Sequence, residues 1–249
     1  MIEKIMKAVK SGNKKRGRNI TIGAVVGFLL SCTVAIGADE YLWIKNDSGI
    51  KFSTDNNLST STDNPYSENN WDGSIYINNI ALSGTDNDSS TKGYGLKLEG
   101  DLGEFKLINN GSIAGTATGS NGYSYGIYNN SGTIATLTNN GLITGTATGS
   151  YGSGYGIYKY SGTIATLANN GLITGTATGS NVEGYGIYNN SGSTIESLAN
   201  NGLIIGNGEG YGGQGIYNSG IIKSLINNGL ITGAATESNG RGRGIYNNS

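Results

Sequence analysis

The sequence predicts an all-β protein: a right-handed parallel β-helix (β-solenoid) with coils of about 30 residues, preceded by a helical signal peptide. The first observation is a Gly-Ile-Tyr signature that recurs at 126–128, 156–158, 186–188, 215–217 and 244–246, at spacings of 30, 30, 29 and 29 residues. The second is an Asn-Asn-Gly-x-Ile-x-Gly signature at 109–115, 139–145, 169–175, 200–206 and 227–233. The third is the composition, because 44 Gly and 32 Asn among 249 residues disfavour helices.

The N-terminal segment, residues 1–38, has the layout of a secretory signal peptide. Seven Lys and Arg stand among the first 19 residues against one acid, and an apolar run follows from Ile20 to Ile36. Small residues come next, so we predict cleavage after Ala38 and a mature chain that begins at Asp39. This layout implies export through the Sec translocon, with the basic leader on the cytoplasmic side.

Three other interpretations of this segment stay open. A retained transmembrane helix normally needs about 20 apolar residues, whereas this run has 17, two of them Gly. The basic stretch Lys10–Arg18 could instead bind nucleic acid. Leu29–Cys32 resembles a lipoprotein box, in which Cys32 would be the acylated N-terminus.

Removal of the leader changes the charge of the protein. The leader holds 7 of the 16 Lys and Arg and 1 of the 17 acids, which leaves 9 bases, 16 acids and a net charge of −7. An anionic surface repels nucleic acid and anionic lipid, so neither is expected as a partner. The mature chain contains no Cys, which excludes disulfides.

Residues 39–92 lack the repeat and are expected to form an N-terminal cap. They contain both Trp residues and the single Pro, with strand-like runs at 50–52 and 74–77. The first coil of a solenoid exposes unpaired backbone groups that need cover. We therefore predict a solenoid cap here and a repeat array over 93–249 that is incomplete at its C-terminus.

Each unit of the array is expected to contain three short strands, represented by 125–128, 133–137 and 142–146. Thr, Ile and Tyr favour strands, and Asn and Gly favour the corners between them. Spacings between apolar residues are constant except in one Gly/Asn turn, where Ser193 is an extra residue. Stacked coils would form interior columns from Ile127, Ile157, Ile187, Ile216 and Ile245, and from Ile143, Ile173, Ile204 and Ile231. Asn139, Asn169, Asn200 and Asn227 would form a side-chain ladder at one corner.

Catalytic chemistry has little support in the sequence. The chain has no His, which removes the commonest general base and metal ligand and excludes a Ser-His-Asp triad. Glu99, Asp101 and Glu104 could supply paired carboxylates for glycoside chemistry, but a solvated edge is the simpler interpretation. We expect no enzyme activity, no cofactor and no metal. The many Tyr residues indicate either a contact surface or structural ladders.

The leader, the cap and the Gly-Ile-Tyr-Asn-Asn-Ser-Gly and Asn-Asn-Gly-x-Ile-x-Gly repeats together resemble an autotransporter (type V secretion) passenger of the adhesins of Gram-negative anaerobes. The resemblance covers residues 1–38 and 93–249. It implies export to the periplasm, passage through an outer-membrane β-barrel translocator and display at the cell surface. That family ends in a barrel of amphipathic strands, whereas this chain ends within a repeat, as expected of a truncated product or fragment.

The expected function is therefore that of a non-enzymatic passenger that acts in adhesion or as a stalk, with a receptor or glycan on a host or bacterial surface as its partner. One alternative is a fragment of a carbohydrate-active β-solenoid enzyme. Another is an ice-binding face built from 116–118, 146–148 and 176–178, which read Thr-Ala-Thr. A disordered low-complexity tract is a third, although disorder does not require fixed apolar spacings.

Overall fold

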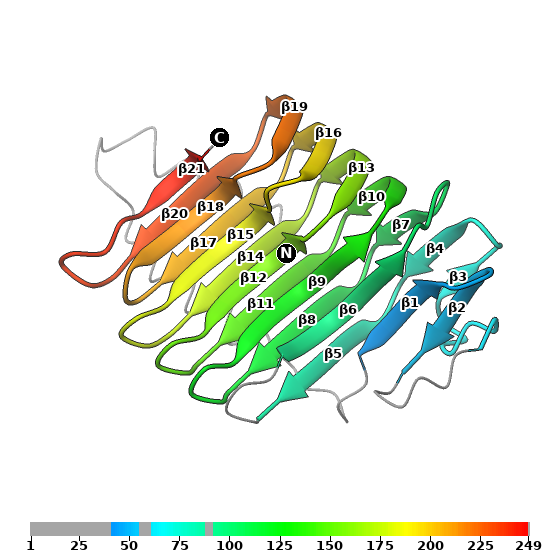
Figure 1. Cartoon of the computed structure of the whole chain (residues 1–249), viewed down its shortest axis with the longest axis horizontal. Coiled ribbons are helices and arrows are strands. Elements are labelled where there is room, and N and C mark those ends of the chain that lie inside the picture. Colours follow the sequence, from blue (N-terminus) through cyan, green and yellow to red (C-terminus); the bar gives the residue numbers. More distant parts are fainter. Residues whose placement is uncertain (1–40, 55–60, 88–91, 249) are drawn as a thin grey trace. The chain divides into compact units, whose positions relative to one another are not determined.

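A computed structural model describes residues 41–54, 61–87 and 92–248 of the chain, which belong to one compact unit. The predicted signal peptide, the cleavage site at Ala38 and Cys32 lie outside these residues. The described part is all-β, and the prediction of a parallel β-solenoid is confirmed (Figure 1). None of the described residues forms a helix of the length and apolarity needed to cross a membrane.

Each coil passes once through three parallel sheets, which we name A, B and C. Sheet A has six strands: β5 (Ala81–Asp86), β8 (Ser112–Ala117), β11 (Leu142–Ala147), β14 (Leu172–Ala177), β17 (Leu203–Gly208) and β20 (Leu230–Ala235). Sheet B has eight: β1 (Leu42–Asn46), β2 (Ile50–Ser53), β6 (Lys92–Gly100), β9 (Tyr123–Ser131), β12 (Ser153–Lys159), β15 (Glu183–Asn189), β18 (Gly212–Asn218) and β21 (Arg243–Asn247). Sheet C has seven: β3 (Asn70–Trp71), β4 (Ile75–Asn78), β7 (Lys106–Asn109), β10 (Thr133–Asn139), β13 (Gly162–Asn169), β16 (Ser193–Asn200) and β19 (Ile221–Asn227).

Strand register pairs the two predicted isoleucine columns residue by residue. Sheet B aligns Ile127, Ile157, Ile187, Ile216 and Ile245, and sheet A aligns Ile143, Ile173, Ile204 and Ile231. All are fully buried except in the last coil, where Ile231 is half-buried and Ile245 is 50% exposed. The sequence assigned the extra residue to Ser193, but Ser193 begins β16 opposite Gly162, so the inserted residue lies in the preceding turn, 190–192, and the apolar pairs that follow keep their register. The Gly/Asn turn thus absorbs the length change outside the core.

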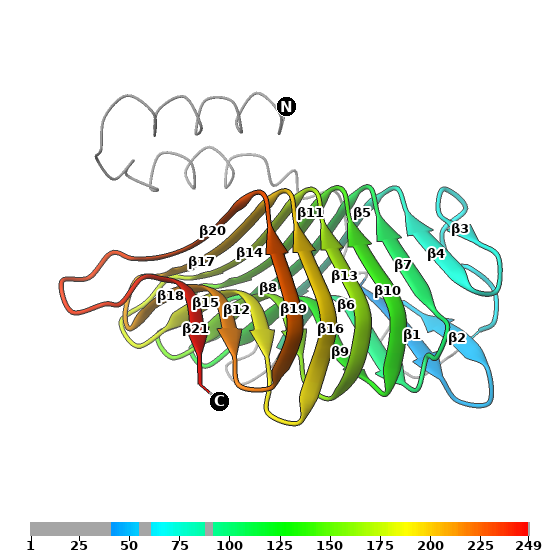
Figure 2. The same cartoon turned by 90° about the horizontal axis from the view of Figure 1, so that it is seen from above.

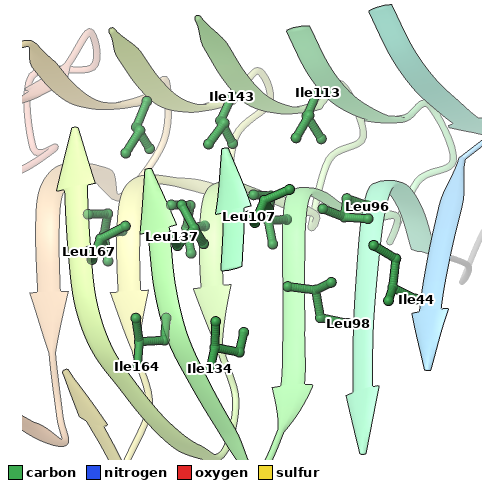
Figure 3. Close-up of a cluster of buried hydrophobic side chains, with 14 of the residues drawn as sticks. Ile44, Leu96, Leu98, Leu107, Ile113, Ile134, Leu137, Ile143, Ile164 and Leu167 are labelled. Carbon is green, nitrogen blue, oxygen red and sulfur yellow. The ribbon is translucent and has the colours of Figure 1, made fainter. Parts of the chain in front are cut away.

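The core is a continuous apolar interior between the three sheets. In one coil it consists of Ile127 from β9, Ile134 and Leu137 from β10, and Ile143 from β11, none of which is exposed. Equivalent side chains of neighbouring coils lie side by side in rows, as Leu107, Leu137 and Leu167 do in Figure 3. Because this coil contributes only four such side chains, it cannot bury a core alone, and stability depends on stacking.

Sheets A and B approach each other so closely that only Gly fits at several positions. A Cβ atom at Gly145 would lie 2.1 Å from the carbonyl oxygen of Tyr155, and one at Gly175 would lie 2.0 Å from that of Tyr185. These contacts are with backbone, which cannot rotate away. Part of the high glycine content therefore reflects close packing of sheets as well as turns.

Residues 39–92, expected to be a cap, contribute three strands to the array. β1, β4 and β5 lie parallel to β6, β7 and β8, with Leu42 opposite Leu96 and Leu82 opposite Ile113. The antiparallel strands β2 and β3 occupy the end positions of sheets B and C. The far end differs, because the last strands β19 and β21 expose Ile221, Leu225 and Ile245 around a hollow of about 410 Å³.

Two asparagine ladders run along the corner between sheets C and A. In the buried ladder each Nδ2 donates to the Oδ1 of the next coil at 2.7–2.9 Å, through Asn78, Asn109, Asn139, Asn169, Asn200 and Asn227. In the exposed ladder each Nδ2 donates to the preceding coil, through Asn79, Asn110, Asn140, Asn170, Asn201 and Asn228. The sequence predicted the buried ladder between residues 139 and 227, and the structure extends it to Asn78.

A third ladder, at the end of the sheet B strands, contains a buried lysine. Asn189 donates to Asn218 and Asn218 to Asn247, both at 2.7 Å. Lys159 occupies the equivalent position on β12 and is fully buried. Its Nζ donates to the backbone oxygens of Ser131, at 3.3 Å, and Ser161. Burial lowers the pKa of Lys159 from 10.5 to about 8. The Nδ2 of Asn129, one coil below, is buried and has no hydrogen-bond partner in the part of the chain that the structure describes.

Candidate functional site: the tyrosine face of sheet B

The Gly-Ile-Tyr units at 126–128, 156–158 and 186–188, each preceded by a Tyr, place two tyrosines on the outer face of sheet B. Strict alternation along a strand would place Tyr125 and Tyr128 on opposite faces. Their rings nevertheless contact each other, with centroids 5.1 Å apart and planes at 72°. Ile127 lies in the interior cluster, so the alternation is interrupted at Gly126, where no register pair is formed. The glycine of the signature therefore allows both tyrosines to face outward.

Stacking across coils turns these tyrosines into two columns, which we call the tyrosine face. Ring centroids in the first column, Tyr94, Tyr125, Tyr155 and Tyr185, are 5.1–5.4 Å apart. Those in the second, Tyr128, Tyr158, Tyr188 and Tyr217, are 4.5–5.7 Å apart. Edge-to-face contacts join the columns, an arrangement that stabilises aromatic clusters.

The tyrosine face is electrically neutral at physiological pH. Burial raises the pKa of the Tyr128 and Tyr188 hydroxyls to about 12, and it raises the pKa of Tyr125 further. In the first column Tyr125, Tyr155 and Tyr185 are almost fully buried, at 5%, 8% and 5% exposed, and Tyr94 is partly buried. The second column is half-buried and forms the accessible surface.

The first column ends before the second, and this creates a groove. Register places Gln214 and then Arg243 above Tyr185, whereas the second column continues through Tyr217 to Tyr246. The groove has a volume of about 740 Å³. Its walls are Glu183, Tyr185, Tyr188, Tyr211, Gln214, Tyr217, Asn239, Arg241, Arg243 and Tyr246. It lies on sheet B where β15, β18 and β21 succeed one another (Figure 2).

Several polar groups of the groove have no partner among the described residues. Gln214 is 5% exposed, and its Oε1 accepts no hydrogen bond. The guanidinium of Arg243 lies 4.1 Å from the ring centre of Tyr246, and neither Arg241 nor Arg243 forms an ion pair in the described part of the chain. The carboxylate of Glu183 accepts a hydrogen bond from the Tyr185 hydroxyl. A buried acceptor without a partner is costly unless a ligand or water supplies a donor.

The carboxylates singled out from the sequence have local structural contacts. Glu99 pairs with Lys97 on the same strand at 3.3 Å. Asp101 accepts hydrogen bonds from the backbone N–H groups of Thr133, at 2.8 Å, and Gly103, at 3.2 Å, in the turn after β6. Glu104 is exposed. Over the ranges that the structure describes, no group of three or more acidic, Cys or His side chains is arranged to hold a metal ion.

The threonine array extends over few coils. Thr116, Thr146 and Thr176 pair in register on sheet A, and the next positions are Asn207 and Ala234. The side chain of Thr118 donates to Asn87 Oδ1 at 2.7 Å. The register thus limits this array to part of sheet A.

Sequence reasoning singled out the tyrosines but not the groove. The signal is a change within the repeat: Gly-Tyr-Gly-Ile-Tyr at 184–188 becomes Gly-Gln-Gly-Ile-Tyr at 213–217 and Gly-Arg-Gly-Ile-Tyr at 242–246. Substitution at one position of a stacked column leaves a gap in that column. Searches of protein-family models, curated proteins and solved structures yield no significant match to this chain, so its functional interpretation relies on this geometry.

Proposed function

We propose that the protein is a non-enzymatic surface passenger of the autotransporter type, which acts in adhesion or as a structural stalk. The observation that carries the proposal is the tyrosine face, which continues over successive coils of a regular stack. Tyrosines are favoured at contact surfaces because they bury a large apolar area and keep a polar hydroxyl. A repeated neutral face on an extended scaffold suits a protein that contacts another surface.

The proposal places the mature protein at the cell surface or outside the cell. Its partners would be the Sec translocon during export, an outer-membrane β-barrel translocator, and a receptor or glycan on a host or bacterial surface. The basic and apolar leader and the net charge of −7 after its removal support export and argue against nucleic acid. The carboxylates near β6 are held by a lysine and by backbone N–H groups, which supports a structural role for them.

Export of the full chain in a Gram-negative host that also carries a matching translocator tests the localisation. We expect N-terminal sequencing of the exported protein to begin at Asp39, and we expect external protease to remove the protein from intact cells. A lipidated start at Cys32 would support a lipoprotein, and retention in the cytoplasm would contradict the proposal. Turnover of a glycan panel that vanishes in Glu99→Gln or Asp101→Asn would favour an enzyme instead.

A further inference from the structure

We propose that the groove at the end of the tyrosine face binds an oligosaccharide that carries one carboxylated sugar. This inference rests on the proposed surface function and specifies the class of ligand. A volume of about 740 Å³ lies within the range of about 300–1,000 Å³ that is usual for small-ligand sites. A ligand of a few sugar rings therefore fits the groove better than the flat surface of a protein partner would.

The wall of the groove matches the apolar side of a sugar ring. Tyr188 and Tyr217 are parallel and stacked, with ring centres 4.5 Å apart, and both are half-buried. Their neighbour Tyr246 is tilted by 57° against Tyr217, so the wall bends where the groove opens. Tyr158 and Tyr217 cover the two faces of Tyr188, so a pyranose ring, which presents C–H groups on its faces, would pack against the ring edges of the wall and against the side of Tyr217 that is turned towards Tyr246. Little conformational freedom is lost by such side chains on binding.

The floor supplies a hydrogen-bond acceptor. Gln214 Oε1 is buried and has no donor among residues 41–54, 61–87 and 92–248, in a position where earlier coils carry a tyrosine ring. A sugar hydroxyl would donate to this oxygen and remove the cost of the unmade bond. Glu183, which also lines the groove, could accept a hydrogen bond from a second hydroxyl through the carboxylate oxygen that Tyr185 does not use.

The rim supplies positive charge. Arg241 and Arg243 form no ion pair within the described ranges, and a guanidinium presents a fork of donors that matches a carboxylate. Contact with the Tyr246 ring at 4.1 Å holds Arg243 in place. Glu183 and the net charge of −7 oppose dense polyanions. Together these charges favour a ligand with a single carboxylate.

Titration of the exported full chain with defined oligosaccharides tests the inference. The probes are sialyllactose and a disaccharide that contains glucuronate, with lactose as the neutral control and a heparin-derived oligosaccharide as the polyanion. We expect at least one carboxylated probe to bind about tenfold or more tightly than lactose or the heparin fragment, because one charged hydrogen bond changes affinity by about this factor. Calorimetry or ligand-observed NMR measures the affinities.

Matched variants separate the groove from general charge effects. Arg243→Gln and Gln214→Leu should each weaken binding of the carboxylated probe about tenfold, and Arg243→Lys should restore only part of the loss. Lys223→Gln also removes one positive charge, but from an exposed position on sheet C, and it should leave binding unchanged. Circular dichroism checks that each variant is folded.

The inference would be overturned if lactose bound as tightly as the carboxylated probes, or if the heparin fragment bound most tightly. It would also be overturned if no carboxylated probe bound. Unchanged affinity in both folded groove variants would do so as well. Protease accessibility on intact cells is measured separately. A failure of sugar binding on a surface-exposed protein therefore refutes the ligand class alone, and intracellular retention refutes the proposed function.

Discussion

Replacement of Lys159 by Asn should stabilise the protein, with a gain that depends on pH. The lysine is fully buried, faces no carboxylate among the described residues and leaves Asn129 Nδ2 without an acceptor. Asn at this position would accept from Asn129 and donate to Asn189, as Asn189 does to Asn218. The substitution therefore removes a buried charge and completes a hydrogen-bonded ladder.

The magnitude follows from the pKa of Lys159, which burial lowers from 10.5 to about 8. Below pH 8 the lysine is charged in both the folded and the unfolded chain, so the full cost of burying the charge lowers the stability of the folded state. At about 1.36 kcal/mol per pKa unit this cost is about 3 kcal/mol at pH 7. Between pH 8 and 10.5 the folded state releases its proton first, so stability rises with pH, and about 1 kcal/mol of the cost remains at pH 10.

Urea unfolding followed by circular dichroism at pH 7 and pH 10 measures both chains. At pH 7 we expect the unfolding free energy of Lys159→Asn to exceed that of the parent by about 3 kcal/mol from the removed charge and by about 1 kcal/mol from the new hydrogen bonds. At pH 10 the difference between the two chains should be about 2 kcal/mol smaller. Ionisation of tyrosines affects both chains equally and cancels in the difference. Lys223→Asn, an exposed lysine, is the control and should change little. A pH-independent difference, or a loss of stability, would refute the reasoning.

Three further changes test the coil geometry. Ile187→Ala should lower the unfolding free energy by about 2–5 kcal/mol, because it opens a cavity in a fully buried column; a negligible shift of the urea midpoint would contradict the column. Gly175→Ala should cost about 3 kcal/mol in the same assay, since its Cβ would lie 2.0 Å from a backbone oxygen. Deletion of 139–168 should keep the β circular dichroism with stability lowered by one coil, whereas deletion of 139–153 should give protease-sensitive protein; equal behaviour would exclude the thirty-residue coil.

The coil could be predicted because its determinants repeat. Ile143 and Ile173 occur at the same place in each unit, and in a solenoid every coil meets a copy of itself, so periodicity alone defines the register. The coil formed by β1, β4 and β5 lacks the Gly-Ile-Tyr signature and keeps only part of the other one, namely Asn78, Asn79 and Gly84, with Leu82 in place of the Ile. Its membership in the array depends on pairing with β6 and β8, which a search for repeats does not detect.

The groove could not be predicted for a related physical reason. Strand alternation assigns Tyr155 and Tyr158 to opposite faces, so the two-column surface requires knowledge of the interruption at the intervening glycine. Gln214 and Arg243 then matter because they replace rings in one column while the other continues. Such a gap is visible in sequence only after the columns themselves are known.

The opposite directions of the two asparagine ladders affect how such a stack can lengthen. Amide dipoles that all pointed one way along the axis would add up, as they do in a helix, and each new coil would add to a field at both ends. Here Asn139 donates towards the C-terminal coils and its neighbour Asn140 donates towards the N-terminal ones, so the two rows largely cancel. Each added coil extends both rows at once, and this corner gains length without accumulating a macrodipole.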